Sequence, residues 1–266
     1  EHMRGGARLG HVSLTDGVVA LLTDPMLGVH MGVTAENLAE KYQISREDQD
    51  SFAAESHRRA VKAVEEGRFT SQTVPVEIAS RKQTLVIDKD EGPRSDTTLE
   101  SLARLKPVFK KDGTVTAGNA SSLNDAASVV LVMEKQKAMD LGLKPVCEIV
   151  AQSVAAVDPR FMGIGPVFAV PKALDAAGLK LEDMKVIELN EAFAAQSLAV
   201  LRELKIDPEK VNTNGGAIAL GHPIGATGAI VFTKAFHELK EAGGGYGLVS
   251  LCIGGGQGIA TVIKSV

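Results

Sequence analysis

Residues 246–263 read YGLVSLCIGGGQGIATVI, two apolar runs joined by a glycine-rich segment, and this pattern decides the fold. Short runs rich in Val, Leu and Ile and bounded by turn residues are typical of buried strands. We therefore expect strands over residues 246–252 and 259–263. Because the glycines lead into a strand and not into a helix, they offer a phosphate no helix N-terminus, which argues against a dinucleotide-binding loop.

Upstream of this stretch, apolar strands alternate with segments of helical periodicity. The pattern predicts strands over 128–133, 146–154 and 186–189, and helices over 167–177, 191–205 and 224–240. Alternation of this kind indicates an α/β layered architecture, in which helices pack on a mostly covered sheet.

The first half of the chain has a different character. Ser45 and Asp48 match a capping box, which predicts a helix that runs to about Glu66 and ends at Gly67. Residues 70–107 mix short β-like pieces, over 74–78 and 85–87, with charged turns, so we expect a loop-rich and exposed region there. The change of character predicts a boundary near residues 118–125.

Composition excludes several classes of protein. The 266 residues are 44% hydrophobic and 23% charged with a net charge of −4, which fits a globular protein and argues against a nucleic-acid-binding surface. No stretch approaches the roughly 18 apolar residues of a membrane-spanning helix, and Glu1 to Gly10 carries no signal-peptide pattern. Two cysteines form neither a disulfide framework nor a four-ligand zinc site, so we expect a reducing compartment and no metal.

Three polar motifs stand at the ends of apolar strands, where ligands bind in α/β sheets. In the first, Asn190 can either cap the following helix or orient a water or an oxyanion. In the second, His222 lies in the glycine-rich stretch 214–228 and is either structural or catalytic. Gly225 and Gly228 are expected to let the following helix pack closely against a neighbour or a ligand.

The third motif is Cys252 with the three glycines that follow it. Cys252 is either a buried packing residue or half of a thiol–imidazole pair with His222, in which the Gly254 amide binds an oxyanion. Cys147 lies inside a predicted strand and is expected to belong to the core. The motifs together predict thiol and imidazole acid–base chemistry on an acyl or carbonyl group, in a hydrolase or a transferase.

At these motifs the sequence resembles the thiolase family, in particular the acetyl-CoA acetyltransferases and bacterial β-ketothiolases. The matching segments are NEAF at 190–193, GHP at 221–223, CIGGG at 252–256 and GTVTAGNAS at 113–121, with further similarity over 30–37 and 162–166. The resemblance implies a layered αβαβα fold, present here in part, with a loop-rich α+β insertion domain that covers coenzyme A.

The resemblance also implies an activity and roles for individual residues. A thiolase places an acyl group on a nucleophilic Cys, and a deprotonated acetyl-CoA then attacks that thioester to give a 3-ketoacyl-CoA, or the reverse occurs. His222 would activate the nucleophile and, with a water held by Asn190, bind the thioester oxygen. Cys252 would move the carbon proton, and the Gly254 amide would contribute to the oxyanion hole. Coenzyme A thioesters are substrates, and no cofactor is implied.

The family resemblance further implies a set of substrate contacts. Ser121 would lie beside the pantetheine amide, and Arg94 and Ser101 near the nucleotide end. The tunnel and the acyl pocket would be shaped by His30, Met31, Phe109, Met162 and Phe193.

One departure from the family is large. The family's nucleophilic Cys lies upstream of the segment at which this chain begins, and neither Cys147 nor Cys252 matches its motif. The chain is therefore expected to be the C-terminal two-thirds of a thiolase, lacking the N-terminal half-domain. Residues 1–121 would be the loop domain, 122–144 the closing elements of the missing half, with an exposed apolar strand and helix, and 145–266 the C-terminal half.

These expectations leave several functional hypotheses open. The chain is expected to act on acyl-CoA substrates, to be a homo-oligomer or to pair with a companion N-terminal fragment, and to bind neither nucleic acid nor membrane. A cytoplasmic location is expected, or the mitochondrial matrix if the source is eukaryotic. The alternatives are a catalytically incomplete CoA-binding fragment, one chain of a split thiolase, and a hydrolase in which Cys252 is the nucleophile.

Overall fold

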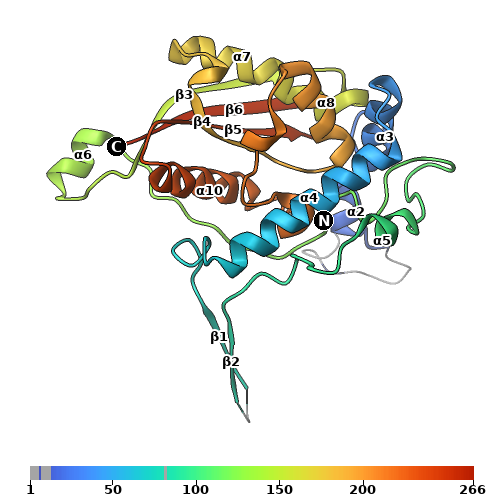
Figure 1. The fold of residues 1–266 in the computed structure, drawn as a ribbon, viewed down its shortest axis with the longest axis horizontal. Coiled ribbons are helices and arrows are strands. Elements are labelled where there is room, and N and C mark those ends of the chain that lie inside the picture. Colours follow the sequence, from blue (N-terminus) through green and yellow to red (C-terminus); the bar gives the residue numbers. More distant parts are fainter. Residues whose placement is uncertain (1–5, 7–12, 81–82) are drawn as a thin grey trace.

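A computed structural model describes residues 6, 13–80 and 83–266 of the chain, and a four-stranded sheet lies at its centre (Figure 1). The strands follow the order β3-β6-β5-β4. Their bounds are β3 (Cys147–Ala156), β4 (Met184–Leu189), β5 (Tyr246–Ile253) and β6 (Gln257–Ser265). β5 runs parallel to β4 and antiparallel to β6, and β6 runs antiparallel to β3. The predicted strands at 146–154, 186–189, 246–252 and 259–263 are therefore confirmed.

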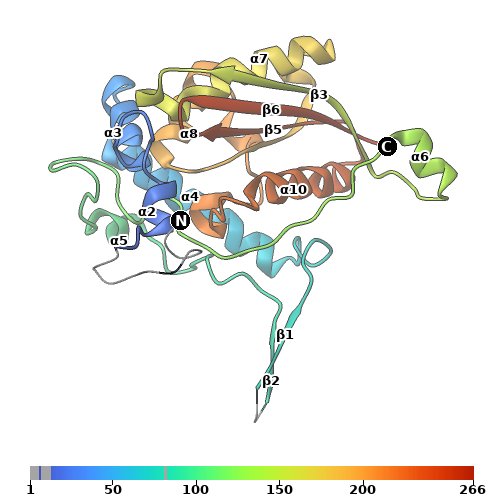
Figure 2. The ribbon, with the colours of Figure 1, turned by 180° about the vertical axis from the view of Figure 1, so that it is seen from behind.

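Helices cover both faces of this sheet. α7 (Gly165–Ala177) packs on β3, β5 and β6, whereas α10 (Thr227–Glu241) packs on the opposite face, as Figures 1 and 2 both show. Side chains alternate along the strands: Leu248 of β5 and Val262 of β6 join the core beneath α7, while Val249 and Ile263 join the core beneath α10. The predicted α/β layered architecture is confirmed.

α7 approaches the sheet closely enough to require glycine. A Cβ atom on Gly258 of β6 would lie 2.2 Å from the backbone carbon of Gly165, the first residue of α7. Gly178 ends the helix in the left-handed conformation at φ 66°, as the sequence predicts.

The N-terminal part packs beside the sheet through α4 (Arg46–Glu65), whose predicted capping box is present. Ser45 Oγ accepts from the Asp48 amide, and the Asp48 carboxylate accepts from the Ser45 amide. The buried face of α4 is more polar than its apolar spacing suggests, because Ser56 and His57 are buried there. The other helices that the structure describes in this part are α2 (Gly17–Leu21), α3 (Met31–Lys41) and α5 (Leu99–Ala103).

A hairpin of β1 (Val76–Ala79) and β2 (Thr84–Ile87) projects away from the rest of the molecule (Figure 1). All eight of its strand residues are exposed. The predicted β-like pieces over 74–78 and 85–87 and the exposed character of this region are therefore confirmed.

The strand expected over 128–133 is not formed. Residues 121–134 contain no helix or strand, and the short α6 (Lys135–Asp140) follows them. The apolar side chains in this segment are exposed, Val129 by 91% and Leu131 by 79%. A strand needs a neighbour for its amide and carbonyl groups, and the segment pairs with none of the described strands.

Two predicted helices begin three residues later than expected. α8 begins at Ala194 (Ala194–Leu204) and α10 begins at Thr227. Phe193 takes the N-cap position of α8, so Asn190 does not cap that helix. The remaining helical turns are η1 (Pro159–Ile164), η2 (Leu181–Asp183), η3 (Pro208–Lys210) and α9 (Ala217–Leu220).

Among the described residues, no helix is long and apolar enough to cross a membrane. Residues 1–10, for which the sequence predicts no signal peptide, lie outside the described residues apart from Gly6.

Candidate active site

The carboxyl ends of β4 and β5 meet at one edge of the sheet and place two of the three motifs side by side. The two strands are parallel, with Leu189 opposite Ser250, and the Asn190 amide donates to the Ser250 carbonyl at 3.0 Å. Asn190 and Cys252 therefore lie on neighbouring strand ends. This is the position at which α/β sheets present functional side chains.

His222 reaches this edge from the turn between α9 and α10. Its backbone amide donates to the Ser122 carbonyl at 3.3 Å and to Asn124 Oδ1 at 3.2 Å. Gly221, at φ 98°, makes room for this contact, because a Cβ atom there would lie 2.3 Å from Asn124 Oδ1. The extended segment after Ser121 thus holds the backbone of His222.

The His222 ring contacts both of its neighbours through nitrogen. Nδ1 lies 2.7 Å from Thr227 Oγ1, and Nε2 lies 3.4 Å from Asn190 Nδ2. Burial lowers the pKa of His222, so the imidazole is neutral at pH 7. The structure therefore brings the NEAF and GHP motifs into direct contact.

Cys252 lies at the end of β5, beside an apolar cluster that includes Met31, Met162 and Phe193. Burial raises the pKa of its thiol to about 12, so the group is protonated at neutral pH. No hydrogen bond joins Cys252 to His222 in the part of the chain that the structure describes. Cys252 packs among apolar groups, and the His222 ring contacts Asn190 and Thr227, so a thiol–imidazole pair between Cys252 and His222 stays a prediction.

The glycines of the motifs serve different purposes. A Cβ atom on Gly254 would lie 2.7 Å from Met31 Cε, and the amide of Gly255 donates to Asp24 Oδ2 at 3.1 Å. A Cβ atom on Gly225 or Gly228 would have no heavy atom within 4 Å among the described residues, so neither glycine is needed for packing against them, and close approach to a ligand stays a prediction.

Most of the expected substrate residues gather around Cys252. The His30 ring stacks on Phe109 at 4.7 Å, and Phe109 meets Phe193 edge-on at 6.2 Å. Ser121 is hydrogen-bonded to the NEAF loop, since both its amide and its hydroxyl donate to the Ala192 carbonyl. The cluster beside Cys252 unites Met31, Met162, Phe109 and Phe193.

Arg94 and Ser101 lie outside this cluster. The Arg94 amide donates to Nδ1 of the buried His57 at 3.1 Å, and the neighbouring Gly92 lies against the carbonyl of Ala219 in α9. Ser101 lies in the first turn of α5, where its hydroxyl donates to the Thr98 carbonyl. Cys147, expected in the core, is only half-buried at the start of β3.

Glu191 is a buried carboxylate that sequence reasoning missed, although it directly follows Asn190. It accepts from the Ser56 hydroxyl at 2.6 Å, from Asn212 Nδ2 at 2.9 Å and from the Ile218 amide at 3.2 Å. Burial raises its pKa. The carboxylate thus ties the Asn190 loop to α4 and α9.

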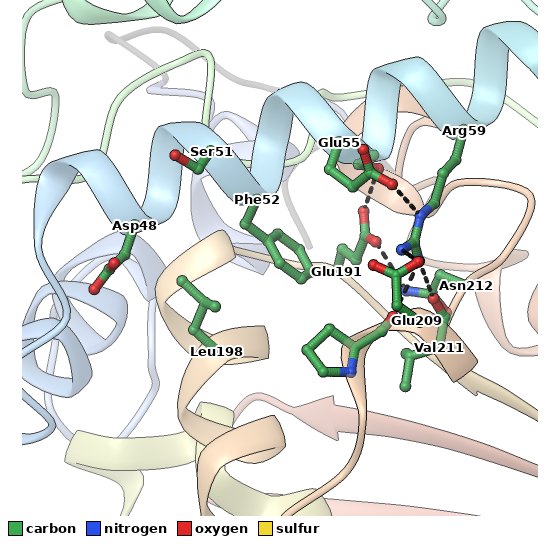
Figure 3. A pocket seen from close by; sticks show the side chains of 12 residues that line it. Asp48, Ser51, Phe52, Glu55, Arg59, Glu191, Leu198, Glu209, Val211 and Asn212 are labelled. Atoms are coloured by element: carbon green, nitrogen blue, oxygen red, sulfur yellow. Dashed lines mark hydrogen bonds and ion pairs between the residues drawn. The ribbon is translucent and has the colours of Figure 1, made fainter.

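A cavity of about 240 Å³ is lined in part by Glu191 (Figure 3). Arg59 of α4 crosses it and pairs with Glu55 and Glu209, while Phe52 faces Leu198. Neither His222 nor Cys252 lines this cavity. The cavity lies between α4 and the C-terminal part, and Glu191 of the NEAF motif is among its lining residues.

Among residues 6, 13–80 and 83–266, no three His, Cys, Asp or Glu side chains are grouped so that they could hold a metal ion.

Comparison with known proteins gives two family matches. The model described as Thiolase, C-terminal domain matches residues 143–265, and that described as Thiolase, N-terminal domain matches residues 1–136. A beta-ketothiolase of Cupriavidus necator is 53% identical over 264 residues, which are 99% of this chain and 67% of the relative. An acetyl-CoA acetyltransferase of Pseudomonas aeruginosa is 54% identical over 262 residues, which are 98% of this chain and 67% of the relative.

Solved structures give the same result. The Bacillus anthracis acetyl-CoA acetyltransferase superposes with a TM-score of 0.94 at 51% identity, covering 100% of this chain and 68% of that structure. The human mitochondrial 3-ketoacyl-CoA thiolase superposes with a TM-score of 0.90 at 45% identity, covering 99% of this chain and 67% of that structure. The mixed α/β fold expected from the resemblance is confirmed.

The comparisons correct one expectation. The statement that the chain lacks the N-terminal thiolase domain is wrong, because residues 1–136 match the model of that domain. They also give no support to a companion N-terminal fragment. The expectation rested on one missing motif, that of the nucleophilic Cys. Residues 30–37 and 113–121, which resemble the family, lie within the N-terminal domain as the family model defines it.

Proposed function

The chain belongs to the thiolase family, and from this premise we propose that His222, Cys252 and Asn190 carry the acid–base chemistry of a thiolase acyltransferase. The reaction joins two acyl-CoA thioesters into a 3-ketoacyl-CoA and, in reverse, cleaves that product by thiolysis. The observation that carries the assignment is the 3.4 Å contact between Asn190 Nδ2 and His222 Nε2, at the end of the strand that pairs with the Cys252 strand.

His222 acts first as a base. A neutral imidazole whose Nε2 carries a lone pair accepts the proton of the acyl-accepting nucleophile. The resulting imidazolium then donates Nε2–H to the thioester oxygen of the second substrate, where negative charge develops as the enolate forms. Asn190 assists through an oriented water, since its Oδ1 is buried and has no hydrogen-bond partner among the described residues.

Cys252 moves the carbon proton. Because burial raises the pKa of Cys252 to about 12, its thiol is protonated and holds a proton for the coenzyme A thiolate, which leaves when the acyl–sulfur bond of the first substrate breaks and the acyl group moves to the nucleophile. The Cys252 thiolate then removes a proton from the methyl carbon of acetyl-CoA, and the carbanion attacks the acyl carbonyl. The Gly254 amide binds the oxyanion of that step. The bond between that carbonyl and the acyl-accepting nucleophile breaks, and the His222 imidazolium returns its proton to the nucleophile. A high pKa makes the thiolate a strong base, whereas a nucleophilic Cys of a hydrolase requires a lowered one.

Substrate binding follows from the same cluster. We assign Ser121 to the pantetheine amide and His30, Met31, Phe109, Met162 and Phe193 to the walls of the acyl pocket and tunnel. Arg94 and Ser101 are assigned to the nucleotide end, on exposed parts of the loop region. Coenzyme A thioesters are substrates in this scheme, and it needs no cofactor.

The sharpest test of the assignment is exchange of the acetyl-CoA methyl protons with solvent deuterium. This step tests the enolate-forming groups His222, Asn190 and Cys252 separately from carbon–carbon bond formation. Cys252→Ala and His222→Ala are each expected to slow exchange by about 10²–10⁴-fold. Cys147→Ala is the matched control, because that thiol lies at the start of β3 and takes no part in the proposed site.

The outcomes separate the alternatives. Exchange that is unchanged in Cys252→Ala contradicts the proposed role of that residue. Calorimetric binding of coenzyme A with neither exchange nor thiolysis of acetoacetyl-CoA supports the catalytically incomplete, CoA-binding alternative. A stable acyl adduct on Cys252 after incubation with acetyl-CoA supports the hydrolase alternative.

Several finer expectations stay predictions. They are a cytoplasmic location, a homo-oligomeric state and the division of the chain at residues 1–121, 122–144 and 145–266. Fractionation of the source cells, light scattering and limited proteolysis test them in turn.

A further inference from the structure

Thr227, the first residue of α10, lies next to the His222 ring and is 2% exposed. Its Oγ1 lies 2.7 Å from His222 Nδ1 and 2.9 Å from the Pro223 carbonyl. The sequence gives no signal for this contact, because the hydroxyl lies five residues after the imidazole and across a turn.

The partners of this hydroxyl fix the direction of each hydrogen bond. A carbonyl oxygen only accepts, so the Thr227 hydroxyl proton points to Pro223. Its Oγ1 lone pair then accepts from His222, which requires the ring proton to be on Nδ1. The opposite nitrogen, Nε2, is left with a lone pair toward Asn190 Nδ2, which has protons to donate.

We propose that Thr227 is a positioning residue that holds neutral His222 in the Nδ1–H tautomer, with the Nε2 lone pair turned toward Asn190. Its catalytic significance rests on the proposed function, because Nε2 is the ring nitrogen that contacts Asn190 at the end of β4. A His that takes up a proton in one step and donates it in the next needs its reactive nitrogen defined in advance.

The rest of the turn supports this role. The Thr227 amide also donates to the Pro223 carbonyl, and the His222 amide is held by Ser122 and Asn124. Backbone and ring are thus fixed from two directions. The threonine hydroxyl is the group that selects the tautomer, since the backbone contacts are indifferent to where the ring proton lies.

The first measurement is independent of activity. In the full chain carrying ¹⁵N-labelled histidine, the His222 nitrogens are expected to show a protonated Nδ1 and an unprotonated Nε2 above the His222 pKa. Thr227→Val removes the hydroxyl at nearly constant shape and is expected to give a mixture of tautomers, whereas Thr227→Ser keeps the single form. A proton on Nε2 in the wild type, or an unchanged spectrum in Thr227→Val, overturns the proposal.

The second measurement is the rate of methyl-proton exchange in acetyl-CoA. Thr227→Val is expected to lower kcat about 10- to 100-fold with little change in KM, and Thr227→Ser to restore most of the rate. Thr261→Val, a matched change of a buried threonine on β6, is expected to leave both constants unchanged. Equal rates in Thr227→Val and wild type contradict the positioning role.

The two measurements distinguish a failure of the proposed function from a failure of the tautomer assignment. A defined Nδ1–H tautomer without any exchange in the wild type contradicts the proposed function and leaves the tautomer assignment standing. If Thr227→Val does not fold, Thr227→Ala and Thr227→Ser give the same comparison, with folding checked by circular dichroism.

Discussion

Two apolar stretches of this chain differ in structure: one forms a buried strand, and the other is exposed and forms none. Residues 246–253 form β5, in which Leu248 is 1% exposed and β4 and β6 supply the hydrogen-bonding neighbours. Residues 128–133 are equally apolar, but they remain without strand structure, and Val129 is 91% exposed. An apolar run therefore predicts a tendency to become a strand, whereas pairing and burial decide whether the strand forms.

The same difference has consequences for stability. Apolar side chains in the sheet contribute by leaving water and by filling a packed core, so their removal also leaves a cavity. Side chains in 128–133 are in water already and have little to lose. Variants in the two stretches should thus differ strongly in their free energy of unfolding. An even larger loss is expected where a buried charge of the sheet loses its partner.

The largest effect is expected from the buried ion pair beneath α10. Lys234 Nζ contacts Glu188 Oε2 of β4 at 2.8 Å and donates to the Gly215 carbonyl at 2.6 Å. Lys234→Met leaves the Glu188 carboxylate buried without its partner, which costs about 3–5 kcal/mol of the free energy of unfolding. Urea unfolding measures the loss, and Lys240→Met on the exposed last turn of α10 is the control.

This loss should depend on pH in a defined direction. Burial raises the pKa of Glu188 well above 4.5, so the folded state binds a proton more readily than the unfolded state and stability falls as pH rises above 4.5. Without the Lys234 charge the pKa rises further. The loss in Lys234→Met should therefore be greater near pH 8 than near pH 5, and a loss that is equal at both would contradict burial of the ionised pair.

The next effect compares the two stretches directly. Leu248→Ala should lower the free energy of unfolding by about 2–5 kcal/mol, because it opens a cavity between β5 and α7. Leu131→Ala makes the same chemical change at a position that is 79% exposed and should cost less than about 0.5 kcal/mol. Similar urea midpoints for the two variants would show that residue 131 is packed in solution.

Local signals in the sequence predicted much of the fold. The Ser45 capping box, the helix end at Gly178 and the strands on either side of Gly254 each depend on residues that are close together in the chain. The strand over 128–133 was wrong because strand formation needs a distant neighbour. The helix expected at 191 began at 194 because Asn190 and Glu191 are used for longer-range contacts.

The site was predictable only in part, for the same reason. The positions of Asn190 and Cys252 at the ends of predicted strands indicated that they lie close together, since parallel neighbouring strands end at the same edge of a sheet. The hydrogen-bond partners of the His222 ring could not be predicted, because Thr227 lies across a turn and Asn190 lies at the end of a strand 32 residues earlier in the chain. Glu188 and Lys234 are 46 residues apart in the sequence, and nothing local shows that they meet.

The smallest effect on stability should come from placing charge in the exposed stretch. Leu131→Lys and Val129→Lys add a solvated ammonium where no core is disturbed, so the free energy of unfolding should stay within about 0.5 kcal/mol of wild type. Contiguous exposed apolar side chains favour association between molecules, so the same variants should associate less at high concentration in sedimentation experiments. If Leu131→Lys instead lowers the urea midpoint as Leu248→Ala does, the contrast between the two stretches fails, because residue 131 would then be buried in solution.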